Sequence, residues 1–254
     1  MGADLFSVRG KIAVVTGGSR GIGLMIARGL VDAGAQVVIS SRKAEVCDAA
    51  AEEIGAVSVP ADLSNRAGVE ELAKAVRERF DRVDVLVNNA GTGWGAPLED
   101  FPDSGWHKVM NTNVHGVFLL TVELLPQLRA SESPSVINIG SIDGIRPPLL
   151  ENYPYSASKA AVHMLTKHLA KRLAGDRIRV NAVAPGPFAT QMTRSFLGTD
   201  EAQAQVGAQV PLGRLGTADD AVGVTLFLAS RAGEYLTGAV IPLDGGITGA
   251  GASL

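Results

Sequence analysis

The sequence predicts a single α/β domain, residues 1–254, built on a doubly wound parallel sheet of seven strands. Short apolar runs of strand length alternate with longer stretches of helical periodicity along the chain. Such alternation is typical of βαβ units, in which helices cover both faces of a parallel sheet. A chain of 254 residues that is 46% hydrophobic can bury one large core, and no Pro/Gly/Ser-rich linker divides it.

Each predicted element rests on its own pattern. Seven runs of mostly aliphatic residues have strand length and are bounded by turn residues. The predicted strands are Lys11–Thr16, Ala35–Ser40, Ala56–Pro60, Val83–Asn88, Ser135–Gly140, Arg177–Val183 and Ala239–Leu243. Apolar residues at helical spacing fill the gaps between them. The main predicted helices are Gly21–Ala33, Arg66–Phe80, Trp106–Arg129 and Pro154–Ala174.

A glycine-rich loop joins the first predicted strand to the first predicted helix. It reads Thr16-Gly17-Gly18-Ser19-Arg20-Gly21-Ile22-Gly23 and lies at the carboxyl edge of the predicted sheet, where nucleotides bind in open α/β folds. Glycines at 17, 21 and 23 allow a tight turn and a close approach to a pyrophosphate, whose charge faces the helix amino terminus. The strand before the loop and the helix after it favour a Rossmann dinucleotide site over a plain turn.

The end of the second predicted strand indicates which dinucleotide binds. An NAD site usually has an acidic residue there to accept the ribose hydroxyls, whereas this chain reads Ser40-Ser41-Arg42-Lys43. Arg20 and Arg42 are therefore candidate partners of the 2′-phosphate of NADP(H), which we expect to be preferred over NAD(H). The alternative, that both arginines are solvated surface residues, stays open at this stage.

Tyr155 and Lys159 are four residues apart, so they project from the same side of a helix. An isolated tyrosine has a pKa of about 10, too high for efficient proton exchange at neutral pH. A nearby cation stabilises the phenolate, so the lysine ammonium together with the positively charged ring of the dinucleotide predicts a tyrosine with a lowered pKa that acts as a general acid. Tyrosine-lysine pairs at this helical spacing are also common on protein surfaces, where they have no catalytic function.

Several motifs in the same order make the chain resemble a classical short-chain dehydrogenase/reductase over essentially its whole length. They are Gly17–Gly23, Asp62-Leu63-Ser64, Asn88-Asn89-Ala90-Gly91, Asn113, Ser141, Tyr155–Lys159 and Pro185-Gly186. Within that family, Asn89–Gly95 and Ser104–Met110 are most similar to rhamnolipid-pathway 3-oxoacyl-acyl-carrier-protein reductases.

The resemblance implies roles for individual residues. Ser141 would hold the developing alkoxide, Tyr155 would donate the proton, Lys159 would lower the tyrosine pKa and contact the nicotinamide ribose, and Asn113 would hold a water that links Lys159 to solvent. The implied cofactor-binding residues are Gly17, Ser19, Arg20, Gly21, Ile22, Gly23, Ser41, Arg42, Asp62, Leu63, Asn89, Ala90, Gly91, Tyr155, Lys159, Pro185, Gly186, Phe188 and Thr190. Residues 188–212 are expected to form a substrate lid.

The predicted function is NADPH-dependent reduction of a ketone, a 3-oxoacyl thioester in particular, to a secondary alcohol. Asp143 stands two residues after Ser141, and a carboxylate at the mouth of the site would repel an acidic substrate. A dehydrogenase of a polyol, sugar or cyclic alcohol is therefore an alternative. A third reading, a non-catalytic dinucleotide-binding regulator, would not need Ser141, Tyr155, Lys159 and Asn113.

The composition indicates which kinds of binding partner the chain is not expected to have. A net charge of −3 and 5% aromatic residues argue against nucleic acid, and no long apolar stretch predicts a membrane span or a leader, so we expect a cytoplasmic protein. The single cysteine, Cys47, is expected to be structural, and the four histidines lack metal-binding spacing, so no metal is expected.

Two assembly predictions follow from the resemblance. An acidic acyl carrier protein would need a local basic patch, for which Arg129, Lys171, Arg172 and Arg177 are candidates, although these could equally be solvated charges at helix ends. A homotetramer is expected to form through the two long helices and the final strand. Its candidate interface residues, which could instead be intramolecular core, are Val114, Val117, Leu120, Val162, Leu165 and Leu169.

Overall fold

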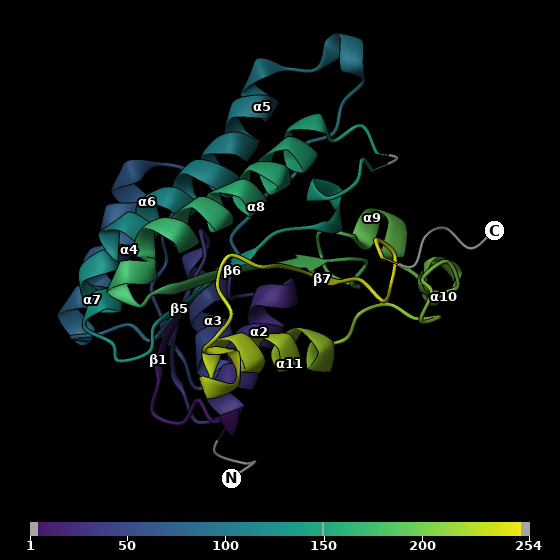
Figure 1. Cartoon of the computed structure of the whole chain (residues 1–254). Helices are drawn as coiled ribbons and strands as arrows, with labels where there is room; N and C mark the ends of the chain where they lie inside the picture. Colours follow the sequence, from purple (N-terminus) through teal and green to yellow (C-terminus); the bar gives the residue numbers. More distant parts are fainter. Residues whose placement is uncertain (1–4, 149, 250–254) are drawn as a thin grey trace.

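A computed structural model describes residues 5–148 and 150–249. Its sheet has seven parallel strands in the order β3-β2-β1-β4-β5-β6-β7 (Figure 1). The strands are β1 (Ile12–Thr16), β2 (Gln36–Ser40), β3 (Val57–Ser58), β4 (Val85–Asn88), β5 (Ser135–Ile139), β6 (Arg179–Pro185) and β7 (Val240–Leu243). The predicted doubly wound parallel sheet is confirmed.

Helices cover both faces of the sheet (Figure 1). One layer contains α2 (Gly21–Asp32), α3 (Ala44–Ile54) and α11 (Ala218–Ala229), and in it α2 packs against both of the others. The other layer contains α4 (Arg66–Arg79), α5 (Asp103–Met110), α6 (Gly116–Glu123), α7 (Leu125–Arg129) and α8 (Tyr153–Leu173), with α4 packed on α6 and α5 on α8. Two short helices, α9 (Arg194–Leu197) and α10 (Asp200–Gly207), follow β6 outside these layers.

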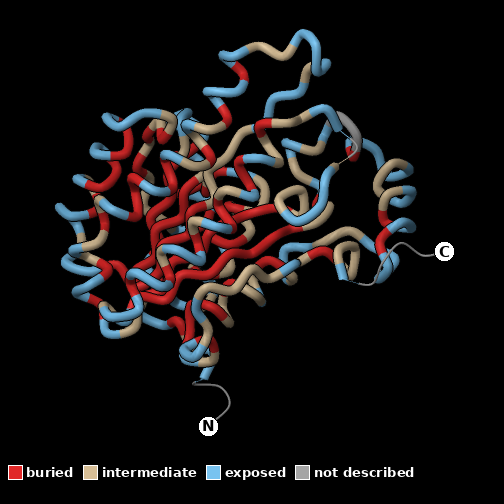
Figure 2. Tube along the Cα trace, turned by 45° about the horizontal axis from the view of Figure 1, so that its top comes forward, coloured by how far each residue is buried: buried red, intermediate tan, exposed pale blue. Residues whose placement is uncertain are grey.

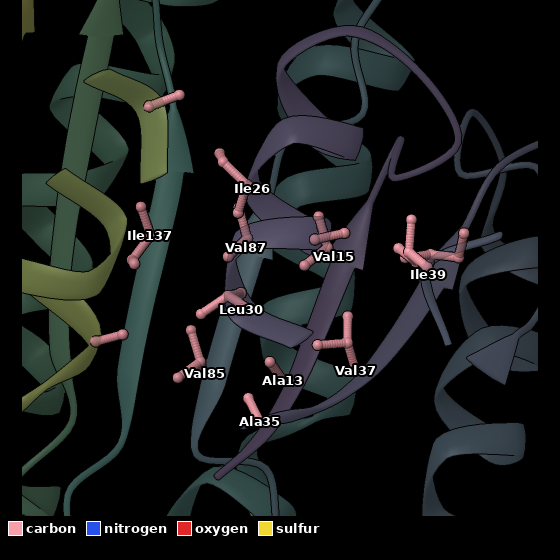
Figure 3. Packing of buried hydrophobic residues seen from close by; sticks show 14 of the residues in the cluster. Ala13, Val15, Ile26, Leu30, Ala35, Val37, Ile39, Val85, Val87 and Ile137 are labelled. Atoms are coloured by element: carbon pink, nitrogen blue, oxygen red, sulfur yellow. The ribbon is translucent and has the colours of Figure 1, made fainter. Parts of the chain in front are cut away.

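The buried core has two halves because side chains alternate between the faces of each strand. Ala13 and Val15 of β1 point into the half formed with α2 and α11, whereas Val14 points into the half formed with α4 and α6. Figure 3 shows the first half, where Ile26 and Leu30 of α2 lie against the sheet. The buried trace in Figure 2 follows the strands through the centre of the molecule. Cys47 of α3 is buried in this first half, as expected of a structural cysteine.

The predicted helix Trp106–Arg129 is wrong as a single element. It begins at Asp103, contains a π-helical turn at Asn111–His115, and breaks at Leu124. Pro126 explains the break, because proline lacks the amide that would continue the hydrogen bonds of α6 and is accommodated in the first turn of a new helix. Strand β6 begins at Arg179, two residues later than predicted, because Arg177 has a left-handed φ of 58°.

The strand order places a crevice above the middle of the sheet. From β1 the chain moves outward to β2 and β3, then crosses back to β4 on the other side of β1. At such a switch point the loops after the two central strands separate, and ligands bind at the carboxyl ends of the strands. Over the described ranges, no helix combines the length and apolar character needed to cross a bilayer.

Candidate active site

The loop after β1 folds as the glycine spacing predicts. Gly17 and Gly21 have φ angles of 63° and 55°, which other residues rarely adopt. A side chain at Gly23 would overlap the Gly17 carbonyl oxygen, so this glycine allows α2 to begin directly behind the turn. Ser19 is buried in the loop, and Ile22 packs on the core from the first turn of α2. The loop thus presents backbone at the amino end of a helix, as a pyrophosphate site requires.

Thr16 and Asn89 tie the loops after β1 and β4 together across the switch point. The Thr16 hydroxyl accepts hydrogen bonds from the backbone amides of Asn89 and Ala90, both at 3.0 Å. The Asn89 side-chain amide donates to the Thr16 and Gly17 carbonyls at 2.9 and 3.2 Å. The Asn89 side chain therefore fixes the glycine loop. Sequence reasoning missed Thr16, whose only signal was its place at the end of β1.

The end of β2 carries buried polar groups and an exposed arginine. The hydroxyls of Ser40 and Ser41 are buried without a hydrogen-bond partner among the described residues. Arg42 follows them and is exposed. Arg20 lies at the other side of the glycine loop, where its guanidinium donates to the Gln191 side chain at 2.7 Å. The two predicted phosphate partners thus differ, because Arg42 extends to solvent and Arg20 is already bonded.

Asp62 and Leu63 follow β3, the edge strand that pairs with β2. The Asp62 carboxylate accepts the Ser64 amide at 3.0 Å, which holds the turn, and the partly buried residue stays accessible. Leu63 is buried in the core half beneath α4. Only a small edge of Leu63 remains for contact with an adenine ring.

Ser141, Tyr155 and Lys159 meet above β5, although they come from two separate segments. Ser141 starts the turn after β5, and Tyr155 and Lys159 lie one turn apart in α8. Ser141 hydrogen-bonds the Tyr155 side chain. The Lys159 ammonium donates to the Ile139 carbonyl at 2.7 Å and lies 5.5 Å from the centre of the tyrosine ring. The structure thus assembles the predicted catalytic group.

The predicted lowering of the tyrosine pKa is wrong for the protein alone. Burial raises the pKa of Tyr155 to about 12, with the Asp143 charge adding to this and the Ser141 hydrogen bond opposing it. Lys159 does not stabilise the phenolate because it is turned toward Ile139. Burial lowers the pKa of Lys159 to about 8, although the Asp143 charge raises it. At neutral pH the tyrosine therefore holds its proton and the lysine is charged.

Asn113 is buried in the π-helical turn, and its side chain is fully engaged. Its carbonyl oxygen accepts the Thr92 amide at 2.8 Å, while its amide donates to the Thr92 carbonyl at 2.9 Å and to the Ser158 hydroxyl at 3.0 Å. Gly91 lies beside both Asn113 and Lys159. The side chain therefore joins the loop after β4 to α8, a structural role that the expected water-holding role did not include.

The loop after β6 approaches the glycine loop from above. Pro185 ends the strand, and Gly186 packs so closely on Asp244 that an added Cβ would lie 2.9 Å from its backbone. Thr190 lies over Gly21, within 3.4 Å of where a Cβ there would be. The Phe188 side chain points the other way, into the core against Gly216, so only its backbone can contact a cofactor. Of the predicted residues in this loop, Phe188 is thus the least suited to binding through its side chain.

The chain matches the model of a known protein family over most of its length. The family model described as enoyl-(acyl carrier protein) reductase, a short-chain dehydrogenase/reductase model, matches residues 17–248. The chain belongs to the short-chain dehydrogenase/reductase family. This family membership accounts for the joint presence of the glycine loop and the serine, tyrosine and lysine group.

Individual family members are similar over almost the full chain. A rhamnolipid biosynthesis 3-oxoacyl-[acyl-carrier-protein] reductase of Pseudomonas aeruginosa is 50% identical over 249 residues, covering 95% of this chain and 97% of that protein. A gluconate 5-dehydrogenase of Gluconobacter oxydans is 37% identical, covering 96% and 97%. The solved structure of a Pseudomonas aeruginosa RhlG/NADP active-site complex has a TM-score of 0.92 at 48% identity, covering 96% of this chain and 98% of that one.

Proposed function

We propose that this short-chain dehydrogenase/reductase reduces the 3-oxo group of an acyl thioester to a secondary alcohol with NADPH. The observation that carries the proposal is the contact between Ser141 and a protonated Tyr155 at the carboxyl edge of the sheet. A relative 50% identical to this chain is named a 3-oxoacyl-[acyl-carrier-protein] reductase, which supports this substrate class. A non-catalytic regulator would not need this assembled group.

The residues present fit NADPH. Unpartnered buried hydroxyls at the end of β2 suit the adenosine ribose and its phosphate, and the exposed Arg42 suits the phosphate charge. The glycine loop Gly17–Gly23 suits the pyrophosphate, and the backbone of Pro185–Thr190 suits the nicotinamide amide. When bound, NADPH supplies the hydride for the carbonyl carbon.

The chain's own residues supply the proton. Ser141 donates a hydrogen bond to the substrate oxygen and keeps it near the Tyr155 hydroxyl. Tyr155 then transfers its proton to that oxygen as negative charge develops there. Lys159, charged at neutral pH, turns its ammonium from the Ile139 carbonyl toward the tyrosinate as it forms and stabilises it. Asn113 holds the Thr92 segment against α8, so that the group keeps its geometry.

The rate of ketone reduction should fall as pH rises above about 8, where Lys159 loses its proton while Tyr155 keeps its own. Asp143→Asn should move this alkaline limb to lower pH, because the Asp143 charge raises the pKa of Lys159. The measurement is kcat/KM against pH for both proteins. Superimposed profiles would contradict the assignment of the limb to Lys159.

Removing the Arg42 guanidinium should weaken NADPH selectively. Charge-assisted hydrogen bonds are worth about 1.5 to 3 kcal/mol, which corresponds to a roughly 10- to 100-fold rise in the KM for NADPH in Arg42→Ala. The KM for NADH should not change. Arg28→Ala is the matched control, because Arg28 is an exposed arginine on α2 that pairs with Glu53. Equal efficiency of the unmodified enzyme with NADH and NADPH would refute the cofactor preference.

Asp143 gives a second candidate substrate class, a neutral hydroxylated ketone. Its carboxylate is half-buried, hydrogen-bonds Asn152 and acts electrostatically on Tyr155 and Lys159, so it faces the site. The side-chain carbonyl oxygen of Asn152 is also buried without a partner among the described residues. These groups could bind a substrate hydroxyl, and a relative 37% identical to this chain is named a gluconate 5-dehydrogenase. The relative named for the thioester is more similar, at 50% identity.

The Asp143 carboxylate should disfavour anionic ketones. Like charges about 8 Å apart at an effective dielectric constant near 20 repel by about 2 kcal/mol. Asp143→Asn should therefore raise kcat/KM for 5-keto-gluconate by roughly 10- to 30-fold relative to a neutral acetoacetyl thioester. An unchanged ratio would show that Asp143 does not face the substrate.

We also propose carrier-protein delivery and a homotetramer. Arg129 is a weak carrier contact because it pairs with Asp176 at 2.8 Å, which leaves the exposed Lys171, Arg172 and Arg177 as candidates. Of the expected interface residues, Val117, Leu120 and Val162 are wrong because they are buried within the chain. Exposed apolar side chains that better support helix pairing are Phe118 and Val122 of α6 and Met164 of α8.

The segment 188–212, which contains α9 and α10, is the proposed substrate lid.

A further inference from the structure

His163 lies directly beneath the loop that carries Ser141. It is buried in α8, one helical turn after Lys159. A Cβ added at Gly140 would overlap His163 Nε2 and lie 2.7 Å from its Cδ2, and a Cβ added at Gly144 would lie 2.8 Å from its Cε1. One edge of the imidazole ring thus supports the residue before Ser141, and another edge supports the end of the turn after it.

The polar atoms of this imidazole indicate a neutral ring that serves packing. Nε2 is buried without a hydrogen-bond partner among the described residues, and the ring also interacts with the Gly144 backbone. Burial lowers the pKa of His163, and the nearby charges of Lys159 and Lys167 lower it further. The proposed reaction assigns no proton transfer to this ring.

Ser141 has few other supports. The Gly140 amide donates to the Val183 carbonyl at 2.7 Å, which fixes the start of the loop to β6. The Asp143 and Gly144 amides donate to the hydroxyl and the carbonyl of Ser141, at 3.1 and 3.0 Å, which are bonds within the turn itself. His163 is the side chain that supports the loop on both sides of Ser141 and also belongs to the helix that carries Tyr155.

We propose that His163 is a positioning residue that fixes the distance between Ser141 and Tyr155 by clamping Gly140 and Gly144 onto α8. The inference rests on the proposed function only in taking Ser141 and Tyr155 as the reacting pair. If the ring is removed, the loop can settle toward α8, and the hydrogen bond from Ser141 to Tyr155 is lost. The glycine loop after β1 lies on other elements, so cofactor binding is unaffected.

The test is a rescue experiment at Gly140. His163→Ala should lower kcat about 10- to 100-fold, the range expected when a reacting group is misplaced by about 1 Å. Gly140→Ala should lower kcat similarly, because its Cβ collides with the ring. The double variant should recover most of the kcat lost in Gly140→Ala, since the smaller side chain at 163 makes room. The dissociation constant of NADPH, measured by fluorescence titration, should stay unchanged in all three variants.

Gly144→Ala and His168→Ala are the matched controls. A Cβ at Gly144 would also lie 2.6 Å from the backbone carbonyl carbon of Lys159 and 2.7 Å from the Ala160 amide, so His163→Ala cannot relieve its collision. Gly144→Ala should therefore be impaired with or without His163. His168 is an exposed histidine of the same helix, and its replacement should leave kcat unchanged.

Additive losses in the Gly140→Ala/His163→Ala variant, or wild-type kcat in His163→Ala, would overturn the proposal. The thermal unfolding midpoints of the same variants give a readout that does not depend on turnover, and there too the double variant should be more stable than Gly140→Ala. If His163→Ala does not fold, His163→Val leaves room for the same rescue. If the proposed substrate is wrong, activity is low in the wild type and in every variant alike. If His163 does not position the loop, only the recovery of kcat in the double variant is lost.

Discussion

Tyr155→Phe is expected to lower kcat for ketone reduction by about two to four orders of magnitude, the usual contribution of general acid catalysis. The substitution removes only the hydroxyl that hydrogen-bonds Ser141 and carries the proton at neutral pH. The ring keeps its packing beside Lys159, so the dissociation constant of NADPH should change little. The measurements are steady-state kinetics and a fluorescence titration with NADPH.

Tyr153→Phe is the control for this prediction. Tyr153 lies two residues earlier in α8 and bonds the exposed Glu151 side chain, so its hydroxyl is not expected to reach the substrate oxygen. That variant should retain near wild-type kcat. If Tyr155→Phe keeps more than about a tenth of wild-type kcat, far above what the loss of a general acid allows, the assignment of the proton donor is wrong.

Asn113→Leu is expected to reduce both stability and turnover. The substitution leaves the Thr92 amide and the Thr92 carbonyl without their partner, whereas the Ser158 hydroxyl keeps its hydrogen bond to the Tyr155 carbonyl at 2.7 Å. Each buried group left unsatisfied costs about 1 to 3 kcal/mol, and partial solvent access at Thr92 reduces the total, so the free energy of unfolding should fall by about 2 to 4 kcal/mol. Turnover should fall about 10- to 100-fold, because the loop after β4 loses its connection to α8 near Lys159.

The neighbouring Asn111 provides the control. It is exposed in the same π-helical turn, so Asn111→Leu should change the free energy of unfolding by no more than about 0.5 kcal/mol. Denaturant titration of the two variants beside wild type gives the comparison. Equal stability of Asn113→Leu and wild type would show that the Asn113 network does not hold this part of the site.

The fold could be predicted because its signals are local. Short aliphatic runs such as the one ending at Thr16 are typical of buried strands, and the helical stretches between them favour parallel pairing. The break at Leu124 and the π-helical turn at Asn113 were not predicted, because apolar periodicity continues through both. The break comes from Pro126, whose signal the apolar periodicity outweighed. The π-helical turn carries Asn113, which hydrogen-bonds the distant Thr92 and Ser158, and a single helix pattern does not record such bonds.

The positions of the candidate catalytic side chains could be predicted better than their protonation states. Spacing along one helix correctly placed Tyr155 beside Lys159, and the loop after β5 delivered Ser141. For the protein alone the direction of the tyrosine pKa was wrong, because burial and the orientation of Lys159 toward Ile139 depend on tertiary packing. His163 carried no signal either, since its importance lies in contact with two glycines that precede it by about twenty residues.

The most direct test of the proposed function is the oxidation of NADPH by the purified protein with acetoacetyl N-acetylcysteamine, beside crotonyl N-acetylcysteamine and 5-keto-gluconate. The account predicts formation of the 3-hydroxy thioester in equal amount to the NADPH consumed, a much lower rate with NADH, and no reduction of the crotonyl double bond. Faster reduction of 5-keto-gluconate or of the crotonyl thioester than of the 3-oxo thioester would contradict it.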